Sequence, residues 1–186
     1  MKNLNMIFAG FGGQGVLFAG KVAAYAGLLE NREISWLPSY GPEMRGGTAN
    51  CSVCISDEPI GSPLVTNPNV LVAMNLPSLD KFIDTVEPGG TVILDSSLIE
   101  KKVERTDVTV HYIPASAMAE EQSLKGLANM ILTGKLFRSV CCAGGDYGFC
   151  TEETLDKAIQ KCVPARKAEM LDFNRKAVQL GADYNA

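Results

Sequence analysis

A glycine-rich turn lies between a short apolar run and a helical pattern near the start of this chain. The run Met6–Ala9 is typical of a buried strand, and it leads into Gly10-Phe11-Gly12-Gly13-Gln14-Gly15. From Gln14 to Leu29, small and apolar residues recur at helical spacing. The turn has the G-x-G-x-x-G spacing, which permits a tight strand-to-helix connection and close approach of a ligand to the backbone. The chain is therefore predicted to begin as a βα unit of a parallel sheet.

Predicted strands and helices alternate along the rest of the chain. Runs of β-forming residues predict strands at Glu33–Leu37, Thr48–Ile55, Val70–Met74, Thr91–Leu94 and Val108–Ile113. Helices are predicted at Pro77–Val86, at Lys125–Val140, after the candidate N-cap Thr151, and from Pro164 onward. We expect one domain, residues 1–186, with an α/β, Rossmann-like, doubly wound and mostly parallel sheet. Because no helix separates the second and third predicted strands, an inserted hairpin or antiparallel strand is expected there.

Composition and charge restrict the classes of partner. The 186 residues are 46% hydrophobic and 20% charged, which is typical of a soluble globular protein. The chain has 17 basic and 21 acidic residues and no basic stripe, so we expect no nucleic-acid partner. No apolar run reaches the ~18 residues that a membrane helix needs, and no signal-peptide cleavage site follows the first run. We therefore predict a cytoplasmic protein without a membrane partner, whose six cysteines are thiols.

The glycine turn does not identify its ligand by itself. A dinucleotide site requires an acidic residue at the end of the second strand, where this sequence has Pro38 and Ser39. NAD and FAD are therefore disfavoured, but a free-standing nucleotide-binding protein of the Rossmann type and a regulatory binding module both stay open. A phosphate-bearing ligand at the helix amino terminus and simple helix–strand packing stay open as well. The candidate ligand-binding residues of the turn are Gly10, Gly12, Gly13, Gln14 and Gly15.

A second glycine-rich segment follows the second predicted strand. It reads Ser39-Tyr40-Gly41-Pro42-Glu43-Met44-Arg45-Gly46-Gly47. Its proline and glycines favour a defined loop, and the Arg45 guanidinium suits a carboxylate or phosphate. A surface pair between Glu43 and Arg45 explains the same two charges. Since both loops follow parallel strands, we expect them at the same carboxyl edge of the sheet. The residues predicted to face a partner or an active site are Ser39, Tyr40, Gly41, Pro42, Glu43, Arg45, Gly46 and Gly47.

No set of catalytic side chains can be assembled from the sequence. Cys51 and Cys54 form a C-x-x-C, but residues three apart in a strand point to opposite faces, which opposes metal binding. The closely spaced cysteines of an iron–sulfur protein are absent. His111 is the only histidine and has no identifiable partner, and Asp95-Ser96-Ser97 suits either a site or helix capping. Cys141, Cys142 and Cys150 are interpreted as buried small hydrophobic residues. We predict no catalytic residue and no metal ligand on this chain.

The two glycine-rich segments together resemble one family. Gly10-Phe11-Gly12-Gly13-Gln14-Gly15 followed by the Ser39–Gly47 segment is similar to the γ subunit of 2-oxoacid:ferredoxin oxidoreductases, the pyruvate/ketoisovalerate oxidoreductase γ family. The segment Lys125–Leu136, centred on Ala128-Asn129-Met130, resembles a later helix of that family. The resemblance covers nearly the whole chain. Within the family, it is nearest to the subunits of 2-oxoglutarate and branched-chain 2-oxoacid enzymes.

This resemblance implies a role in a larger enzyme. Such holoenzymes oxidatively decarboxylate a 2-oxoacid, here expected to be 2-oxoglutarate, to an acyl-coenzyme A, and they pass electrons to ferredoxin or a similar acceptor. Thiamine diphosphate and Mg lie between the α and β subunits, and iron–sulfur clusters lie in β or in a ferredoxin-like δ subunit. The domain equivalent to this chain is implicated in binding the co-substrate coenzyme A. The chain is thus expected to hold no cofactor and to be inactive alone, because the chemistry belongs to the cofactor and to partner chains.

Overall fold

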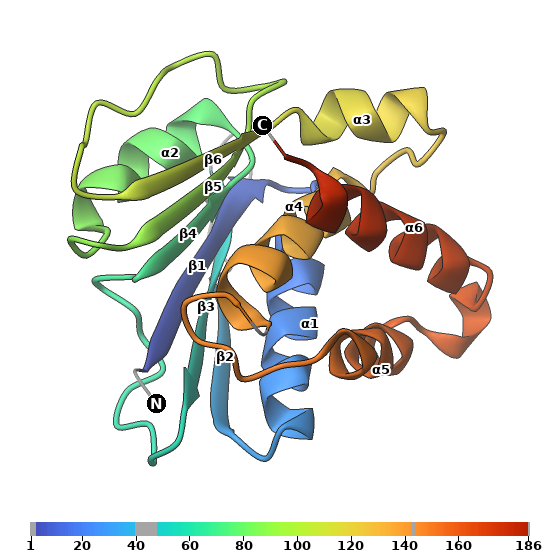
Figure 1. The fold of residues 1–186 in the computed structure, drawn as a ribbon, viewed down its shortest axis with the longest axis horizontal. Coiled ribbons are helices and arrows are strands. Elements are labelled where there is room, and N and C mark those ends of the chain that lie inside the picture. Colours follow the sequence, from blue (N-terminus) through green and yellow to red (C-terminus); the bar gives the residue numbers. More distant parts are fainter. Residues whose placement is uncertain (1–2, 40–47, 143, 186) are drawn as a thin grey trace.

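The computed structural model describes residues 3–39, 48–142 and 144–185, and its centre is a six-stranded sheet (Figure 1). The strands follow the order β2-β3-β1-β4-β5-β6. Their bounds are β1 Leu4–Phe11, β2 Glu33–Ser39, β3 Thr48–Ser56, β4 Val70–Ala73, β5 Thr91–Asp95 and β6 Thr109–Ile113. The strands β1, β4, β5 and β6 pair in parallel, whereas β3 runs antiparallel between β1 and β2. The predicted α/β sheet with an inserted antiparallel strand is confirmed.

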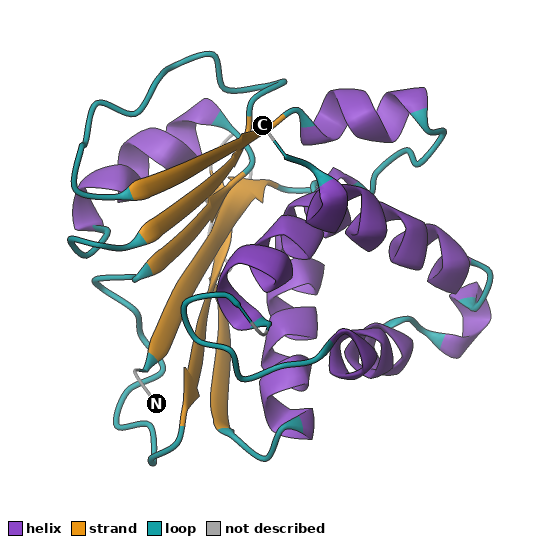
Figure 2. Cartoon of the chain, in the orientation of Figure 1, coloured by secondary structure: helices purple, strands orange, loops and turns teal. Residues whose placement is uncertain are grey.

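The helices cover the two faces of the sheet unequally (Figure 2). Their bounds are α1 Val16–Leu29, α2 Leu76–Phe82, α3 Ala115–Glu121, α4 Ala128–Leu136, α5 Glu152–Cys162 and α6 Met170–Asp183. One face carries α2, and the other carries α1 and α4, with α5 and α6 packed outside them. Because side chains alternate along a strand, Met6 and Phe8 of β1 enter the larger core, while Ile7 and Ala9 enter the smaller core under α2. None of the helices in the described ranges combines the length and apolarity needed to cross a membrane.

Two glycines allow α4 and α6 to pack with their backbones in contact. A Cβ added to Gly134 of α4 would overlap the backbone carbonyl of Val178 in α6. A Cβ added to Gly181 of α6 would overlap the carbonyl of Ile131 in α4. These two helices share the most extensive contact between any pair of helices in the described structure. We call the close approach at Gly134 and Gly181 the α4–α6 crossing.

The structure shifts several predicted boundaries for identifiable reasons. Helix α1 begins at Val16 and not at Gln14, because Gly13 and Gly15 have φ of 94° and 75°, outside the helical region. The helix predicted from Lys125 begins at Ala128, after Gly126 with φ of 79°, and it changes to a π-helical turn at Phe137–Cys141. Helix α3 was not predicted. Pro164 precedes a short 3₁₀ segment and does not start α6.

Candidate functional site

The carboxyl ends of the parallel strands form one edge of the sheet, and the glycine turn lies there. The turn follows β1, while the neighbouring strands β4, β5 and β6 lead into α2, a short turn and α3 at the same edge (Figure 1). Ligands of open α/β sheets bind outside this edge, so the described residues around it form the candidate site. The turn was predicted to lie here, and the register confirms that position.

Two of the turn's glycines have backbone conformations that disfavour any other residue. Gly13 and Gly15 have positive φ, and a Cβ on Gly13 would meet no atom of the described residues within 4 Å. The space beside Gly13 is therefore open to a ligand. Gly10 differs, because a Cβ there would press on the Gln14 and Val16 side chains. The role of Gly10 is close packing at the end of β1. Gly12, between Gly10 and Gly13 in the turn, is exposed.

Gln14 braces the turn against the neighbouring strand. Its Oε1 accepts a hydrogen bond from the Phe11 backbone N–H at 2.6 Å, and its Nε2 donates to the Met74 carbonyl at 3.1 Å. Asn75, which also caps α2 by accepting from the Ser78 N–H, donates to the same Oε1 at 3.4 Å. The Gln14 amide thus joins the ends of β1 and β4. Its predicted contact with a cofactor stays a prediction, although the residue lines the hollow described below.

The amino terminus of α1 is held by a side chain distant in sequence. Asn129 of α4 donates its Nδ2 to the Gly15 carbonyl at 3.0 Å, and it is buried. Among the residues that the structure describes, no side chain caps the first turn of α1, and that turn has no acidic residue. Its free N–H groups and the positive end of the helix dipole therefore favour an anion. Asn129 Oδ1 is also buried without a hydrogen-bond partner among the described residues.

A hollow of about 340 Å³ opens between the glycine turn, α3 and the start of α4. Its lining includes Gly13 and Gln14 of the turn, Ser116 and Glu120 of α3, and Lys125 just before α4. Lys125 is exposed and supplies a positive charge, while Glu120 supplies a negative one. The sequence did not identify Lys125, Glu120 or Asn129 as site residues. They come together only because α3 and α4 pack beside the turn.

Asp95 at the end of β5 has a structural role in this edge. It is fully buried, and its carboxylate accepts hydrogen bonds from the Ser97 N–H at 3.1 Å and from the Ser116 hydroxyl at 2.6 Å. The Ser97 hydroxyl in turn accepts from the Ala117 N–H in α3 at 3.1 Å. Ser97 thus contacts the first turn of α3 from outside the helix, but the N-cap residue of α3 is Pro114. This network fixes α3, and hence one wall of the hollow, to the sheet.

Only the ends of the second glycine-rich loop lie within the described residues. Tyr40, Gly41, Pro42, Glu43, Arg45, Gly46 and Gly47 lie outside them. Ser39 pairs with Asn50, which pairs with Ala9 of β1, and Thr48 pairs with Phe11. Both flanking residues are thus at the edge that carries the glycine turn, as predicted. The interface role of Arg45 and its neighbours stays a prediction.

The described cysteines and His111 do not gather into a metal site. Cys51 belongs to the larger core and Cys54 to the smaller, so their side chains point to opposite faces as predicted. Burial raises the pKa of the Cys51 thiol to about 12. Burial also lowers the pKa of His111, assisted by the nearby Lys135 charge and opposed by Asp146. Within the described ranges, no three His, Cys, Asp or Glu residues gather in a way that could hold a metal ion.

Comparisons with known proteins match the chain to subunits of oxoacid oxidoreductases. The ketoisovalerate oxidoreductase subunit VorA of Methanothermobacter thermautotrophicus is 42% identical over 176 residues, which cover 95% of this chain and 35% of that subunit. This chain therefore spans about a third of the length of that relative. The 2-oxoglutarate synthase subunit KorC of Methanocaldococcus jannaschii is 38% identical over 172 residues, which cover 90% of this chain and 88% of that subunit.

Solved structures with the same fold agree with these relatives. The γ subunit of a keto/oxoacid ferredoxin oxidoreductase from Geobacter sulfurreducens PCA superposes with a TM-score of 0.79 at 26% identity, covering 97% of this chain and 96% of that one. The 2-oxoglutarate:ferredoxin oxidoreductase of Magnetococcus marinus gives a TM-score of 0.82 at 25% identity, covering 97% of this chain and 30% of that one. A free-standing nucleotide-binding protein is not favoured by these matches.

The family match covers nearly all of the sequence. Residues 5–184 match the sequence profile described as "Pyruvate ferredoxin/flavodoxin oxidoreductase". This range contains both glycine-rich segments and the Asn129 helix, which are the features that carried the predicted resemblance. That resemblance is confirmed. The chain belongs to the pyruvate ferredoxin/flavodoxin oxidoreductase family.

Proposed function

We propose that this chain is the γ subunit of a 2-oxoacid:acceptor oxidoreductase that converts 2-oxoglutarate and coenzyme A to succinyl-coenzyme A and CO₂ while reducing ferredoxin or a similar acceptor. The observation that carries this proposal is the match to KorC, which extends over 90% of this chain and 88% of that subunit. Because KorC is named as a subunit of 2-oxoglutarate synthase, this likeness supports a subunit role in a 2-oxoglutarate enzyme. The 42% identity to VorA supports a branched-chain 2-oxoacid as the second candidate substrate.

In this proposal, the glycine turn and Lys125 bind phosphate groups of coenzyme A. The uncapped first turn of α1, the open space beside Gly13 and the positive charge of Lys125 all favour an anion at one side of the hollow. Glu120 on α3 repels a phosphate, so the anion is expected beside the turn and Lys125 and away from α3. The Magnetococcus enzyme whose fold this chain shares was solved with coenzyme A bound.

The carboxyl edge is also the proposed docking surface for the α and β subunits. Three large apolar side chains there are exposed: Phe11 at the end of β1, Leu76 at the start of α2 and Leu98 after β5, with 42%, 38% and 49% of their surface accessible. They follow three adjacent strands, so they lie along one edge. Exposed apolar groups of this size gain free energy when a partner covers them. The Ser39–Gly47 loop would join the same contact.

The redox chemistry is assigned to the partner chains in this proposal. Thiamine diphosphate with Mg would lie between α and β, and the iron–sulfur clusters in β or in a δ subunit. The two cysteines of the C-x-x-C face opposite sides of the sheet, so they cannot act together as cluster ligands. The contribution of this chain is to position coenzyme A and to complete the enzyme's active-site wall.

Reconstitution of the full chain with the α and β subunits of its complex tests the proposal. Reduction of methyl viologen is followed with thiamine diphosphate, coenzyme A and either 2-oxoglutarate or 2-oxoisovalerate. We expect turnover only when all subunits are present, with 2-oxoglutarate the better substrate. Turnover by the lone chain, or full activity of α and β without it, would contradict the subunit role. Preference for 2-oxoisovalerate would instead select the branched-chain assignment.

The Arg45→Ala variant tests the second loop in the same assay. It should fold normally, because the sequence predicts Arg45 to lie in a loop, and surface substitutions usually change stability by under about 0.5 kcal/mol. It should weaken subunit assembly or raise the apparent KM for coenzyme A. Wild-type assembly together with wild-type kinetics would show that Arg45 has no interface role, and loss of folding would show that the loop is structural.

A further inference from the structure

Two cysteines that are eight positions apart in the sequence meet on the side of the molecule away from the glycine turn. Cys142 follows the π-helical turn Phe137–Cys141, and Cys150 immediately precedes Thr151, the N-cap of α5. The two residues form a parallel bridge, and the Cys150 N–H donates to the Cys141 carbonyl at 3.0 Å. Both are free thiols, and the Cys150 thiol donates a hydrogen bond to the Thr151 carbonyl at 3.2 Å.

The bridge gives the pair the geometry that a disulfide requires. Residues directly opposite on neighbouring strands have backbones about 4.8 Å apart. This separation falls within the Cα–Cα range of about 4.4–6.8 Å that disulfides span. Opposite residues of a bridge also project to the same side of the ladder, so Cys142 and Cys150 share one side. A bond between the sulfurs therefore requires little movement of the backbone.

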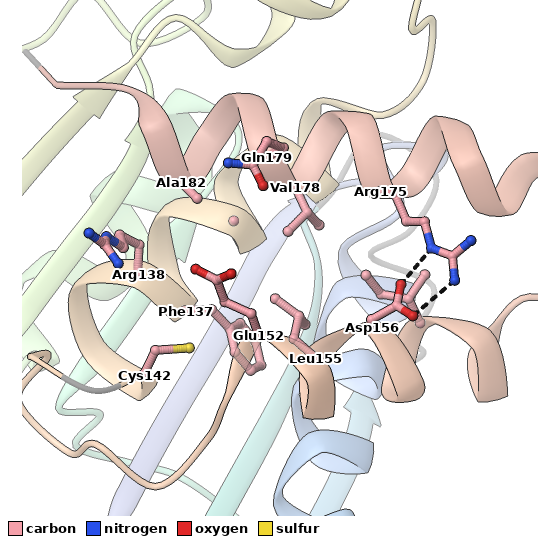
Figure 3. Close-up of a pocket in the computed structure, with 12 residues that line it drawn as sticks. Phe137, Arg138, Cys142, Glu152, Leu155, Asp156, Arg175, Val178, Gln179 and Ala182 are labelled. Atoms are coloured by element: carbon pink, nitrogen blue, oxygen red, sulfur yellow. Dashed lines mark hydrogen bonds and ion pairs between the residues drawn. The ribbon is translucent and has the colours of Figure 1, made fainter.

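Cys142 has a route to small reagents. It lines a hollow of about 140 Å³ enclosed by the π-helical turn, α5 and α6, and its sulfur points into that space (Figure 3). Phe137 and Leu155 supply apolar walls, while Arg138 and Glu152 lie at the same end of the hollow as Cys142. Cys150 is more deeply buried and does not line the hollow.

The surroundings make the two thiols chemically unequal. The hydrogen bond from Cys150 lowers the pKa of Cys142, and the Arg138 charge acts in the same direction, while burial, Glu152 and Glu30 oppose them. The same hydrogen bond, burial and the charge of Cys142 raise the pKa of Cys150. Cys142 is therefore the better nucleophile at neutral pH, and Cys150 is placed to react second.

The remaining four cysteines lack this combination of features. Burial raises the pKa of Cys51, Cys54, Cys141 and Cys162 above its ordinary value. Cys141 is the sequence neighbour of Cys142, yet it is fully buried in the larger core. The structure thus separates one thiol pair from four inert thiols.

We propose that Cys142 and Cys150 form a redox-active dithiol that low-molecular-weight disulfides oxidise reversibly. The Cys142 thiolate attacks one sulfur of the reagent R–S–S–R, forming a Cys142–S–S–R mixed disulfide and releasing RS⁻. Cys150 then loses its proton to solvent and attacks the Cys142 sulfur, which forms the intramolecular disulfide and releases the second RS⁻. The protein loses two electrons and two protons, and the reagent gains them as two RSH molecules.

The test exposes the reduced full chain to oxidised glutathione and maps the products by non-reducing peptide mass spectrometry. We expect a Cys142–Cys150 disulfide, reversed by dithiothreitol, to form at least about tenfold faster than any adduct on the other four cysteines, which corresponds to one pKa unit between competing thiols. A Cys141–Cys150 bond, or modification of the other cysteines at a comparable rate, would overturn the proposal. Because the mapping uses the wild-type chain, its result does not depend on how any variant folds.

Two variants separate the roles of the thiols, and a third serves as the control. Cys150→Ser should stop at one glutathione per chain on Cys142, and Cys142→Ser should take up none at either position. Cys162→Ser, at the end of helix α5, which follows Cys150, should oxidise like the wild type. Retention of fast uptake by Cys142→Ser, or formation of an intramolecular disulfide by Cys150→Ser, would contradict the proposed order of attack.

Discussion

The glycine turn and the α4–α6 crossing use the same residue type for opposite purposes. At the crossing, Gly134 and Gly181 let two helices touch, and a Cβ on either would overlap the backbone of the other helix. At the turn, no atom in the described part of the chain lies within 4 Å of the position of a Cβ on Gly13, so this glycine fills no contact there. The pair Gly134 and Gly181 increases contact inside the protein, whereas Gly13 keeps backbone available to something outside it.

This difference separates stability from function within one fold. Replacing a glycine at the crossing by a residue with a Cβ forces two packed helices apart, because backbone atoms cannot rotate out of the way as side chains can. Replacing Gly13 or Gly15 places the new residue at an unfavourable positive φ. Because these positions are exposed or half-buried, the turn has some room to adjust. Substitutions at the crossing should therefore change the free energy of unfolding, whereas substitutions in the turn should also change the apparent KM for coenzyme A.

The largest expected effect is that of Gly181→Ala at the crossing. In an ordinary helix interior, this change stabilises a protein by about 0.5–1 kcal/mol. Here the new methyl overlaps the Ile131 carbonyl, so we expect a loss of about 3 kcal/mol in the free energy of unfolding, measured by urea denaturation. Lys176→Ala, at an exposed position of the same helix, is the matched control and should stay near the wild type. Stabilisation by Gly181→Ala would show that α4 and α6 are farther apart than described.

The two glycine sets also differ in how far the sequence could predict them. The turn was predictable because its glycines cluster between an apolar run and a helical pattern, all within one short segment. Gly134 and Gly181 are isolated in two helices, and nothing local indicates that these helices cross. Asn129 likewise reaches Gly15 across 114 positions, so its hydrogen bond depends on tertiary packing. The antiparallel β3 was predictable because a helix was missing, whereas the seven-residue α3 has no long periodic pattern.

Gly15→Ala should have the second largest effect on stability. It should change both the free energy of unfolding and the apparent KM for coenzyme A. An alanine at φ of 75° costs about 1–2 kcal/mol, and its methyl would press on the Asn129 amide that holds the turn. We expect that loss in chemical denaturation, together with a raised apparent KM for coenzyme A in the reconstituted enzyme. Gly61→Ala is the control, since a Cβ there meets no atom within 4 Å and its φ lies outside the left-handed region. Wild-type stability of Gly15→Ala would mean that the turn adapts and is not constrained as described.

Asp156→Asn tests the ion pair that joins α5 to α6. It should lower the free energy of unfolding by less than Gly181→Ala or Gly15→Ala does. Asp156 of α5 accepts two hydrogen bonds from the Arg175 guanidinium of α6, at 2.6 and 2.9 Å (Figure 3). The hydrogen bonds from Arg175 lower the pKa of Asp156, so the folded state favours the ionised carboxylate. Its stabilisation is therefore present above the ordinary carboxyl pKa and is lost as the pH falls through the lowered pKa.

Solvent screens this exposed pair, which keeps the expected effect small. The wild type should be more stable than Asp156→Asn at neutral pH, and the difference should vanish as the pH falls through the lowered pKa of Asp156 and the carboxylate is protonated. Thermal unfolding at a series of pH values measures this difference. A gap between the two proteins that is independent of pH would mean that packing, and not charge, accounts for the effect.

Lys125→Ala should have the smallest effect on folding and the most selective effect on function. Lys125 is exposed and lies on the wall of the hollow beside the glycine turn, so its removal should change the free energy of unfolding by less than about 0.5 kcal/mol. A hydrogen bond from an ammonium group to a phosphate contributes about 1.5 kcal/mol or more, so the apparent KM for coenzyme A should rise roughly tenfold while the KM for the 2-oxoacid is unchanged. Lys125→Arg should restore most of the affinity, since the positive charge is retained, and Lys176→Ala should leave both constants at wild-type values. If Lys125→Ala raised both Michaelis constants equally, the hollow would be acting through subunit assembly and not through a phosphate contact.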